Sequence, residues 1–159
     1  MTELHKLWLL LDSNDIHIRT RYIRSAANIW ADALSRERDK SDWQLSPRLF
    51  AFLNLRWGPH TVDRFASLEN TQLPRYNSKW LDPKTEAVDS LRLPAAAWRA
   101  ETNWCNPPWE LLDDLVLKLR CTGAAATVIA PHWPGKPWHQ QLSELASEAV
   151  VYPPSFGLF

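Results

Sequence analysis

The sequence predicts an α/β protein with a parallel or mixed sheet. From residue 61 onward the pattern runs strand, long loop, helix, strand, helix, strand, an order typical of such folds. Residues 126–130 are continuously apolar, as expected for a strand buried on both faces. The 159 residues, 45% hydrophobic and 23% charged, suit one globular domain or a small domain with an appendage.

The first 36 residues predict a helix, a strand and a second helix. Apolar residues at helical spacing favour a helix over 3–11, with a stop signal at 13–15. Residues 16–23 alternate with period two and predict a strand with one solvated, basic face. A second helix is expected over about 25–36.

The main domain is predicted to cover residues 43–159. The stretch 37–42 has no apolar residue and is predicted to be a linker, or else a solvated helix end. Pro47 opens a predicted helix, because proline is favoured in the first helical turn. Gly58-Pro59 breaks the chain after this helix.

Short strands and helices then alternate. Residues 61–66 predict a short strand, and 67–104 predict a long ordered loop with short helices, because they show little periodicity. A leucine-rich face predicts a helix over 110–120, stopped by Gly123. The apolar strand is followed by a predicted helix and a predicted strand, over 138–149 and 150–152.

Composition restricts the function. Lys plus Arg and Asp plus Glu both number 18, so the net charge is zero and any nucleic-acid contact must be local. The four glycines are too far apart for the glycine-rich loops that bind dinucleotides or phosphates. Ten tryptophans indicate either a strongly aromatic core or exposed stacking surfaces.

Cysteine spacing and the start of the chain favour an intracellular protein. Cys105 and Cys121 lie in no metal-like spacing, which favours two buried free thiols. No secretory leader is recognisable, and the apolar run at 7–11 is too short to span a bilayer, so no membrane partner is expected. The sequence does not distinguish nucleus from cytoplasm.

The sharpest local motif is Asn106-Pro107-Pro108-Trp109, just before a predicted helix. Two prolines make the backbone rigid and provide carbonyl acceptors without N–H groups. An asparagine amide and a rigid carbonyl can accept from an exocyclic amino group, and a tryptophan face can stack on a base. The alternative is a proline-rich turn in which Asn106 caps the helix.

Asn-Pro-Pro followed by an aromatic residue resembles the catalytic signature of amino-group DNA methyltransferases. Further stretches in the same order resemble the phage-type DNA N6-adenine methyltransferases, over roughly 42–145: residues 43–50, 58–70, 74–76 and 130–138. The resemblance implies a small Rossmann-like, three-layer sheet domain that uses S-adenosylmethionine and acts on DNA.

This resemblance implies roles for particular residues. Asn106 and the Pro107 carbonyl are expected to accept hydrogen bonds from the amino group of a flipped adenine, with Pro108 keeping the turn rigid. Trp109 replaces the usual tyrosine or phenylalanine as stacking platform. Asp63 matches the family's first acidic position and is expected near S-adenosylmethionine; the alternative is a strand-end residue that caps a turn.

Residues 1–36 are similar to the C-terminal part of a retroelement ribonuclease H domain, on the segments 7–11, 16–23 and 28–36. That resemblance assigns Asp32 to the last of four carboxylates that hold two Mg²⁺ ions in the complete domain. The other three carboxylates have no counterpart here. Asp32 is therefore expected to be a relic, and no ribonuclease H activity is expected.

Both resemblances in this order are typical of DIRS-like retroelements, in which reverse transcriptase and ribonuclease H precede a methyltransferase-like domain. The implied partners are DNA and, in the parent polyprotein, an RNA–DNA hybrid. The alternative is a catalytically inactive nucleic-acid-binding remnant that stacks bases on its tryptophans.

Several residues near these motifs are weaker candidates. Arg64, Arg75 and Lys136 are predicted phosphate contacts, or else ordinary surface charges. His132 follows the apolar strand, where open α/β sheets bind ligands, and is either a proton shuttle or a satisfied loop histidine.

Overall fold

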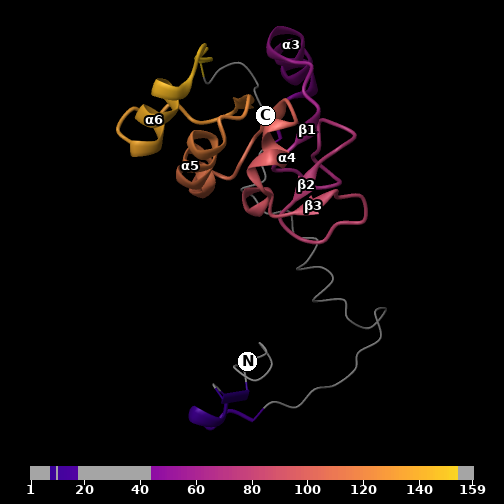
Figure 1. Cartoon of the computed structure of the whole chain (residues 1–159), viewed down its shortest axis with the longest axis vertical. Coiled ribbons are helices and arrows are strands. Elements are labelled where there is room, and N and C mark those ends of the chain that lie inside the picture. Colours follow the sequence, from indigo (N-terminus) through magenta and orange to yellow (C-terminus); the bar gives the residue numbers. More distant parts are fainter. Residues whose placement is uncertain (1–7, 10, 18–43, 154–159) are drawn as a thin grey trace. The chain divides into compact units, whose positions relative to one another are not determined.

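The computed structural model describes residues 8–9, 11–17 and 44–153. The chain divides into two compact units, Met1–Arg38 and Asp39–Phe159 (Figure 1). In the first unit, residues 8–9 and 11–13 are helical and a turn follows at 14–15. The described part of the helix predicted over 3–11 is therefore confirmed, and the helix continues two residues further.

Most other predictions for this unit lie outside the described residues. This holds for the helix over 25–36, for the linker over 37–42 and for Asp32. Of the strand predicted over 16–23, only residues 16–17 are described, and they are not in a strand.

The second unit contains two small parallel sheets. Its three-stranded sheet has the order β1-β4-β5, with β1 at Val62–Asp63, β4 at Asn103–Cys105 and β5 at Ala126–Val128. A two-stranded sheet pairs β2 at Asn77–Ser78 with β3 at Ala87–Val88. The predicted α/β class is confirmed.

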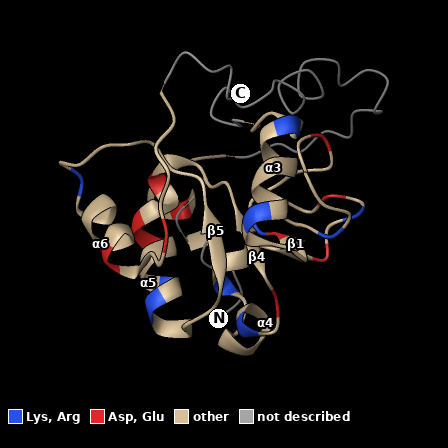
Figure 2. Ribbon diagram, turned by 90° about the horizontal axis from the view of Figure 1, so that it is seen from above, with Lys and Arg blue, Asp and Glu red and all other residues tan. Residues whose placement is uncertain are grey.

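Helices cover both faces of the three-stranded sheet. Figure 2 shows α5 and α6 on one side of β5 and α3 on the other side of the sheet. The helical elements of this unit are α3 (Pro47–Trp57), η2 (Ser90–Arg92), α4 (Ala95–Arg99), η3 (Trp109–Leu111), α5 (Leu112–Thr122) and α6 (Pro137–Leu145).

Alternation along β4 divides the core into layers, because successive strand side chains point to opposite faces. Trp104 is fully buried and packs with Phe50 and Leu53 of α3. Its neighbour Cys105, also fully buried, packs on the other face with Trp98 of α4 and Leu115 of α5. A third cluster joins α5 to α6 through Leu112, Val116 and Trp138.

The local start and stop signals act as predicted. Pro47 occupies the first turn of α3, and the backbone N–H of Gly58 donates to the Asn54 carbonyl at its end. A Cβ on Gly58 would lie 2.4 Å from that carbonyl oxygen, so only glycine is accommodated there. Gly123 ends α5 with a φ of 62°, the left-handed conformation that glycine adopts without strain.

The structure corrects several predicted elements. The segment 67–104 contains short helices, η2 and α4, as expected, but it also contains β2, β3 and the start of β4, where no strand was expected. The helix expected over 138–149 ends at Leu145, and residues 150–152 form no strand. Cys121 is exposed, so only Cys105 is a buried thiol.

The apolar strand is also less buried than predicted. β5 lies at the edge of the three-stranded sheet, and only Thr127 is buried, while Ala126 and Val128 are partly exposed. An edge strand has a sheet neighbour on one side only, so Ala126 and Val128 stay partly accessible along the free edge although they pack against the core clusters.

Candidate functional site

The carboxyl ends of three parallel strands meet at one edge of the sheet. Asp63, Trp104 and Thr127 lie side by side across β1, β4 and β5. Asn106 directly follows the end of the central strand β4, and residues 129–133 follow β5. Ligands of open α/β sheets bind outside the carboxyl ends of the strands, so this edge is the candidate site.

The Asn-Pro-Pro segment leaves this edge and leads into a helix. Pro107 is buried, whereas Asn106 and Pro108 are partly exposed. The N-cap positions of η3 and α5 are Pro108 and Leu111, without side-chain cap hydrogen bonds. Asn106 is therefore not the N-cap residue of η3 or of α5, while the proline-rich turn that leads into a helix is present as the alternative expected.

Trp109 belongs to an aromatic cluster that extends from this segment to α6. Its side chain is 40% exposed and meets Trp133 edge to face, with ring centroids 4.9 Å apart. Trp133 is 39% exposed, and its ring centroid lies 6.1 Å from that of Trp138, which is buried against α5. Trp109 thus packs against Trp133, which in turn lies beside the buried residue Trp138.

Asp63 is buried at the end of β1 and organises the loop that follows. Its side chain accepts backbone N–H groups of Phe65 at 3.4 Å and Gln72 at 3.2 Å. Burial raises the pKa of Asp63 to about 6, against the smaller opposing effect of these two bonds. The turn-capping alternative accounts for this arrangement, and a direct cofactor contact stays a prediction.

The raised pKa of Asp63 makes a testable prediction for Asp63→Asn. Because the folded-state pKa of about 6 exceeds the ordinary value of 3.8, Asp63 binds its proton more tightly in the folded protein. Its contribution to stability is present below about pH 4 and is lost as the pH rises through 6. Two pKa units correspond to about 3 kcal/mol.

The free energy of unfolding of Asp63→Asn, measured by urea denaturation, is therefore expected to gain about 3 kcal/mol relative to wild type between pH 4 and pH 7. Other titrating groups, such as His60, are common to both proteins and cancel. Asp113→Asn, which removes an exposed carboxylate, serves as the control. A difference that does not change with pH would show that Asp63 is ionised without penalty.

Arg64 lies in the core and not at the surface, where a phosphate contact was predicted. Its guanidinium is buried and donates from Nε to Asn103 Oδ1 at 2.6 Å, from Nη1 to Asn77 Oδ1 at 2.8 Å and from Nη2 to the Ala97 carbonyl at 2.7 Å. It also stacks over Trp98, 4.9 Å from the ring centroid. The predicted phosphate contact of Arg64 is therefore wrong, because its donors serve the core.

The other two basic candidates remain on the surface. Arg75 is paired with Glu86 and Glu101, whose side chains raise its pKa. A phosphate at Arg75 must compete with these two carboxylates. Lys136 is exposed at the N-terminal boundary of α6, and its backbone N–H donates to the Trp133 carbonyl. Lys136 thus lies close in the chain to the aromatic cluster.

His60 is a buried polar residue that the sequence analysis did not single out. Its Nδ1 lies 2.7 Å from Asn54 Oδ1 and its Nε2 lies 2.7 Å from Thr127 Oγ1, so it links α3 to β5. Since Asn54 Oδ1 can only accept, Nδ1 carries the proton and Nε2 accepts from Thr127. Burial lowers the pKa of His60, in agreement with a neutral ring.

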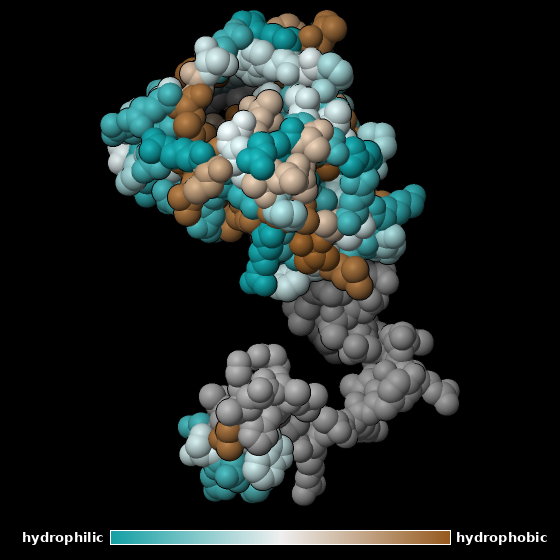
Figure 3. All heavy atoms as spheres, viewed as in Figure 1, coloured by the Kyte–Doolittle hydropathy of each residue, from teal (hydrophilic) through white to brown (hydrophobic). Residues whose placement is uncertain are grey.

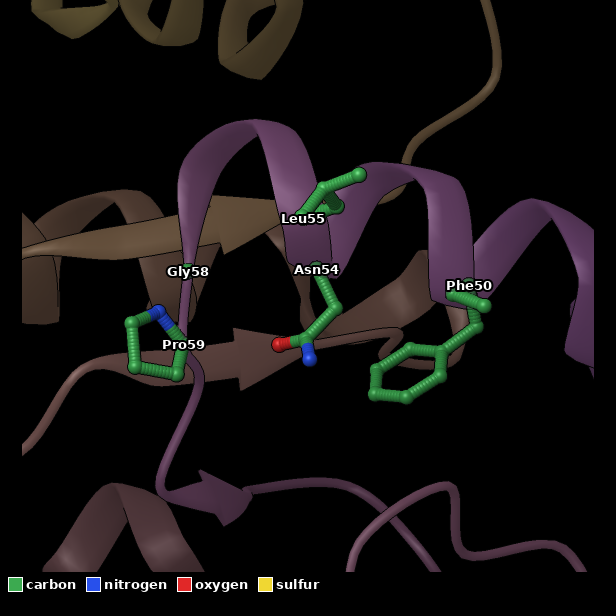
Figure 4. Close-up of a pocket in the computed structure, with 6 residues that line it drawn as sticks. Phe50, Asn54, Leu55, Gly58 and Pro59 are labelled. Carbon is green, nitrogen blue, oxygen red and sulfur yellow. The ribbon is translucent and has the colours of Figure 1, made fainter.

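An open hollow of about 520 Å³ lies beside α3, at the amino end of β1. It is lined by Phe50, Ala51, Asn54 and Leu55 of the helix and by the turn Gly58-Pro59 (Figure 4). The residues predicted from the sequence as a site do not line it. This hollow and the candidate edge are therefore separate features.

The described part of the chain shows neither a metal-binding cluster of three or more ligands nor a helix that could span a membrane. Among residues 8–9, 11–17 and 44–153, no three or more His, Cys, Asp or Glu side chains gather as a metal-binding group. Within the same ranges, no helix combines the length and apolar character needed to cross a membrane. Asp32, the predicted Mg²⁺ ligand, lies outside them.

Comparison of the chain with protein family models, with curated proteins and with solved structures found no match.

Proposed function

We propose that residues 43–159 form an S-adenosylmethionine-dependent DNA methyltransferase-like domain that acts on the amino group of adenine. One observation carries the proposal: Asn106-Pro107-Pro108-Trp109 begins directly at the carboxyl end of the central parallel strand. Helices cover both faces of the three-stranded parallel sheet, and this arrangement supports the proposal of a Rossmann-like fold.

The acceptor base is the part of the reaction that these residues fit best. Asn106 is partly exposed and its amide oxygen can accept from an adenine amino group, together with the Pro107 carbonyl. Trp109 is 40% exposed and can contribute aromatic surface on which the base stacks, with Trp133 beside it. The target adenine must leave the duplex to reach this position.

The cofactor side of the proposal depends on the loop that follows β1. S-adenosylmethionine supplies the methyl group when bound. Both oxygens of Asp63 already accept backbone N–H groups and the residue is only 2% exposed, which leaves little access for a direct bond to the cofactor. We therefore assign Asp63 to holding the loop 65–72 at the edge of the sheet, beside the acceptor residues.

A second candidate function is nucleic-acid binding without catalysis. The exposed and mutually packed Trp109 and Trp133 favour it, since base stacking needs no cofactor and contributes about 1–3 kcal/mol per base. On either proposal residues 1–36 derive from a retroelement ribonuclease H segment, and Mg²⁺ binds only the complete domain. The DIRS-like origin and the DNA or RNA–DNA hybrid partner are part of the same proposal.

Asn106→Ala separates the two functions. The wild-type chain is expected to bind S-adenosylmethionine in isothermal titration and to transfer a labelled methyl group to adenine-containing DNA. Asn106→Ala is expected to lower that transfer by at least about a hundredfold, with nearly unchanged cofactor affinity, because it removes an acceptor of the amino group. Asn14→Ala, at an exposed position of the first unit, is the matched control.

Failure would take one of two forms. A folded wild-type chain that does not bind S-adenosylmethionine contradicts the methyltransferase proposal. If such a chain still binds single-stranded DNA and loses this binding in Trp109→Ala, the second candidate is supported. Loss of both cofactor binding and fold in Asn106→Ala would make Asn106 a structural residue.

A further inference from the structure

Two histidines lie side by side near the beginning of α6: His132 is on the loop that follows β5, and His139 is in the first turn of the helix. His132 Nδ1 and His139 Nε2 are 3.1 Å apart, and the ring centroids are separated by 4.9 Å. His132 is exposed and His139 is half-buried. The seven-residue separation joins the loop to the first turn of the helix.

The distance between these nitrogens suits a shared metal ion. A metal–imidazole bond is about 2.0–2.1 Å long. Two such bonds at a tetrahedral angle place the nitrogens about 3.3–3.4 Å apart, and at a right angle about 2.8–3.0 Å apart. The observed 3.1 Å lies between these values, so the nitrogens are at a suitable separation, and rotation of the two side chains can direct both lone pairs to one point.

The tautomers of the two neutral rings allow this arrangement. In the neutral pair one ring nitrogen donates its hydrogen to the other. If His139 carries its hydrogen on Nδ1 and His132 on Nε2, both facing nitrogens present lone pairs. This requires only a change of tautomer and no net loss of a proton.

We infer that His132 and His139 bind one divalent transition-metal ion of the imidazole-preferring class, such as Ni²⁺, Cu²⁺ or Zn²⁺. Water completes the coordination, because no third metal ligand gathers there among the described residues. The bound ion links the loop carrying Trp133 and Lys136 to α6. Since Trp133 packs on Trp109, the ion also restrains one wall of the aromatic cluster.

The other described histidines do not form such a pair. Both ring nitrogens of His60 already contact Asn54 and Thr127 in a buried setting. His17 is highly exposed and lies beside Asp15. The experiment therefore uses the full chain with three substitutions, His5→Ala, His17→Ala and Cys121→Ser, which remove competing imidazoles and the exposed thiol.

Titration of this background protein with NiCl2 in a calorimeter is expected to show one ion per chain. Adding His132→Ala or His139→Ala is expected to weaken binding at least about tenfold in each case, because the second imidazole binds the same ion intramolecularly. Ni²⁺ is also expected to raise the thermal midpoint of the background protein but not of the single variants. MgCl2, a cation that prefers oxygen ligands, is the control and should not bind.

His132→Gln and His139→Gln keep the polarity of the pair and repeat the test if an alanine variant is poorly folded. Unchanged Ni²⁺ affinity in either single variant overturns the inference, since the site needs both rings. Absence of Ni²⁺ binding by the folded background protein also overturns it. Because S-adenosylmethionine and DNA are absent from the assay, neither result depends on the proposed methyltransferase function.

Discussion

Trp104→Ala is expected to lower the free energy of unfolding by about 3–5 kcal/mol, the usual cost of removing a large buried aromatic side chain. Trp104 is fully buried on the central strand and meets Phe50 edge to face, with centroids 4.8 Å apart, and His60, with centroids 5.1 Å apart. Its removal opens a cavity between the sheet and α3. Domains of this size are stable by about 5–15 kcal/mol, so much of the total is lost.

Urea denaturation followed by far-ultraviolet circular dichroism measures this loss without depending on tryptophan fluorescence. Trp80→Ala makes the same chemical change on a side chain that is 73% exposed, and is expected to change stability by about 0.5 kcal/mol or less. Equal effects at the two positions would contradict the packing of α3 on Trp104.

Arg64→Met is expected to cost about 3–5 kcal/mol, although methionine retains the apolar stem of the side chain. The guanidinium of Arg64 donates to three acceptors, on Asn103, Asn77 and Ala97. Methionine leaves these buried oxygens without that donor, and each loss costs about 1–3 kcal/mol. The expected total is below the sum because the side chains can partly rearrange.

Two further variants show whether geometry or charge matters. Arg64→Lys keeps the charge but concentrates its donors on one nitrogen, so it cannot reach three separated acceptors, and it is expected to lose most of the same free energy. Arg75→Met removes a surface arginine that is paired with Glu86 and Glu101, and is expected to cost at most about 1 kcal/mol. If Arg64→Met lowers the free energy of unfolding only slightly in the denaturation assay, the hydrogen bonds of Arg64 do not stabilise the core.

Residue chemistry outlines the candidate site but does not place it. The Asn-Pro-Pro-Trp motif was recognisable because two consecutive prolines and an exposed aromatic residue are unusual at a helix start. Its position depends on β4, which the sequence analysis missed, since Asn-Trp-Cys is too short to show alternation. The neighbourhood of Trp109 and Trp133, 24 positions apart, has no local signal.

Residue type alone also does not predict which side chains are buried and which are exposed. Arginine is seldom fully buried, so the sequence favoured an exposed Arg64. Three acceptors and the face of Trp98 offset the cost of burying its charge, and these partners come from segments far apart in the chain. Exposed apolar residues are equally hard to predict: Leu55 and Leu81 are 88% and 89% exposed, and Figure 3 shows apolar residues interspersed with hydrophilic ones.

Local sequence alone determined the α/β class, the start of α3 at Pro47, the end of α5 at Gly123 and the apolar character of β5. These depend on backbone preferences and short-range periodicity, which a few neighbouring residues specify. Only the tertiary structure decided that β4 is the central strand, that Arg64 and His60 are buried, and that His132 meets His139. Those outcomes depend on contacts between distant segments, whose desolvation and hydrogen bonding are defined only when the chain has folded.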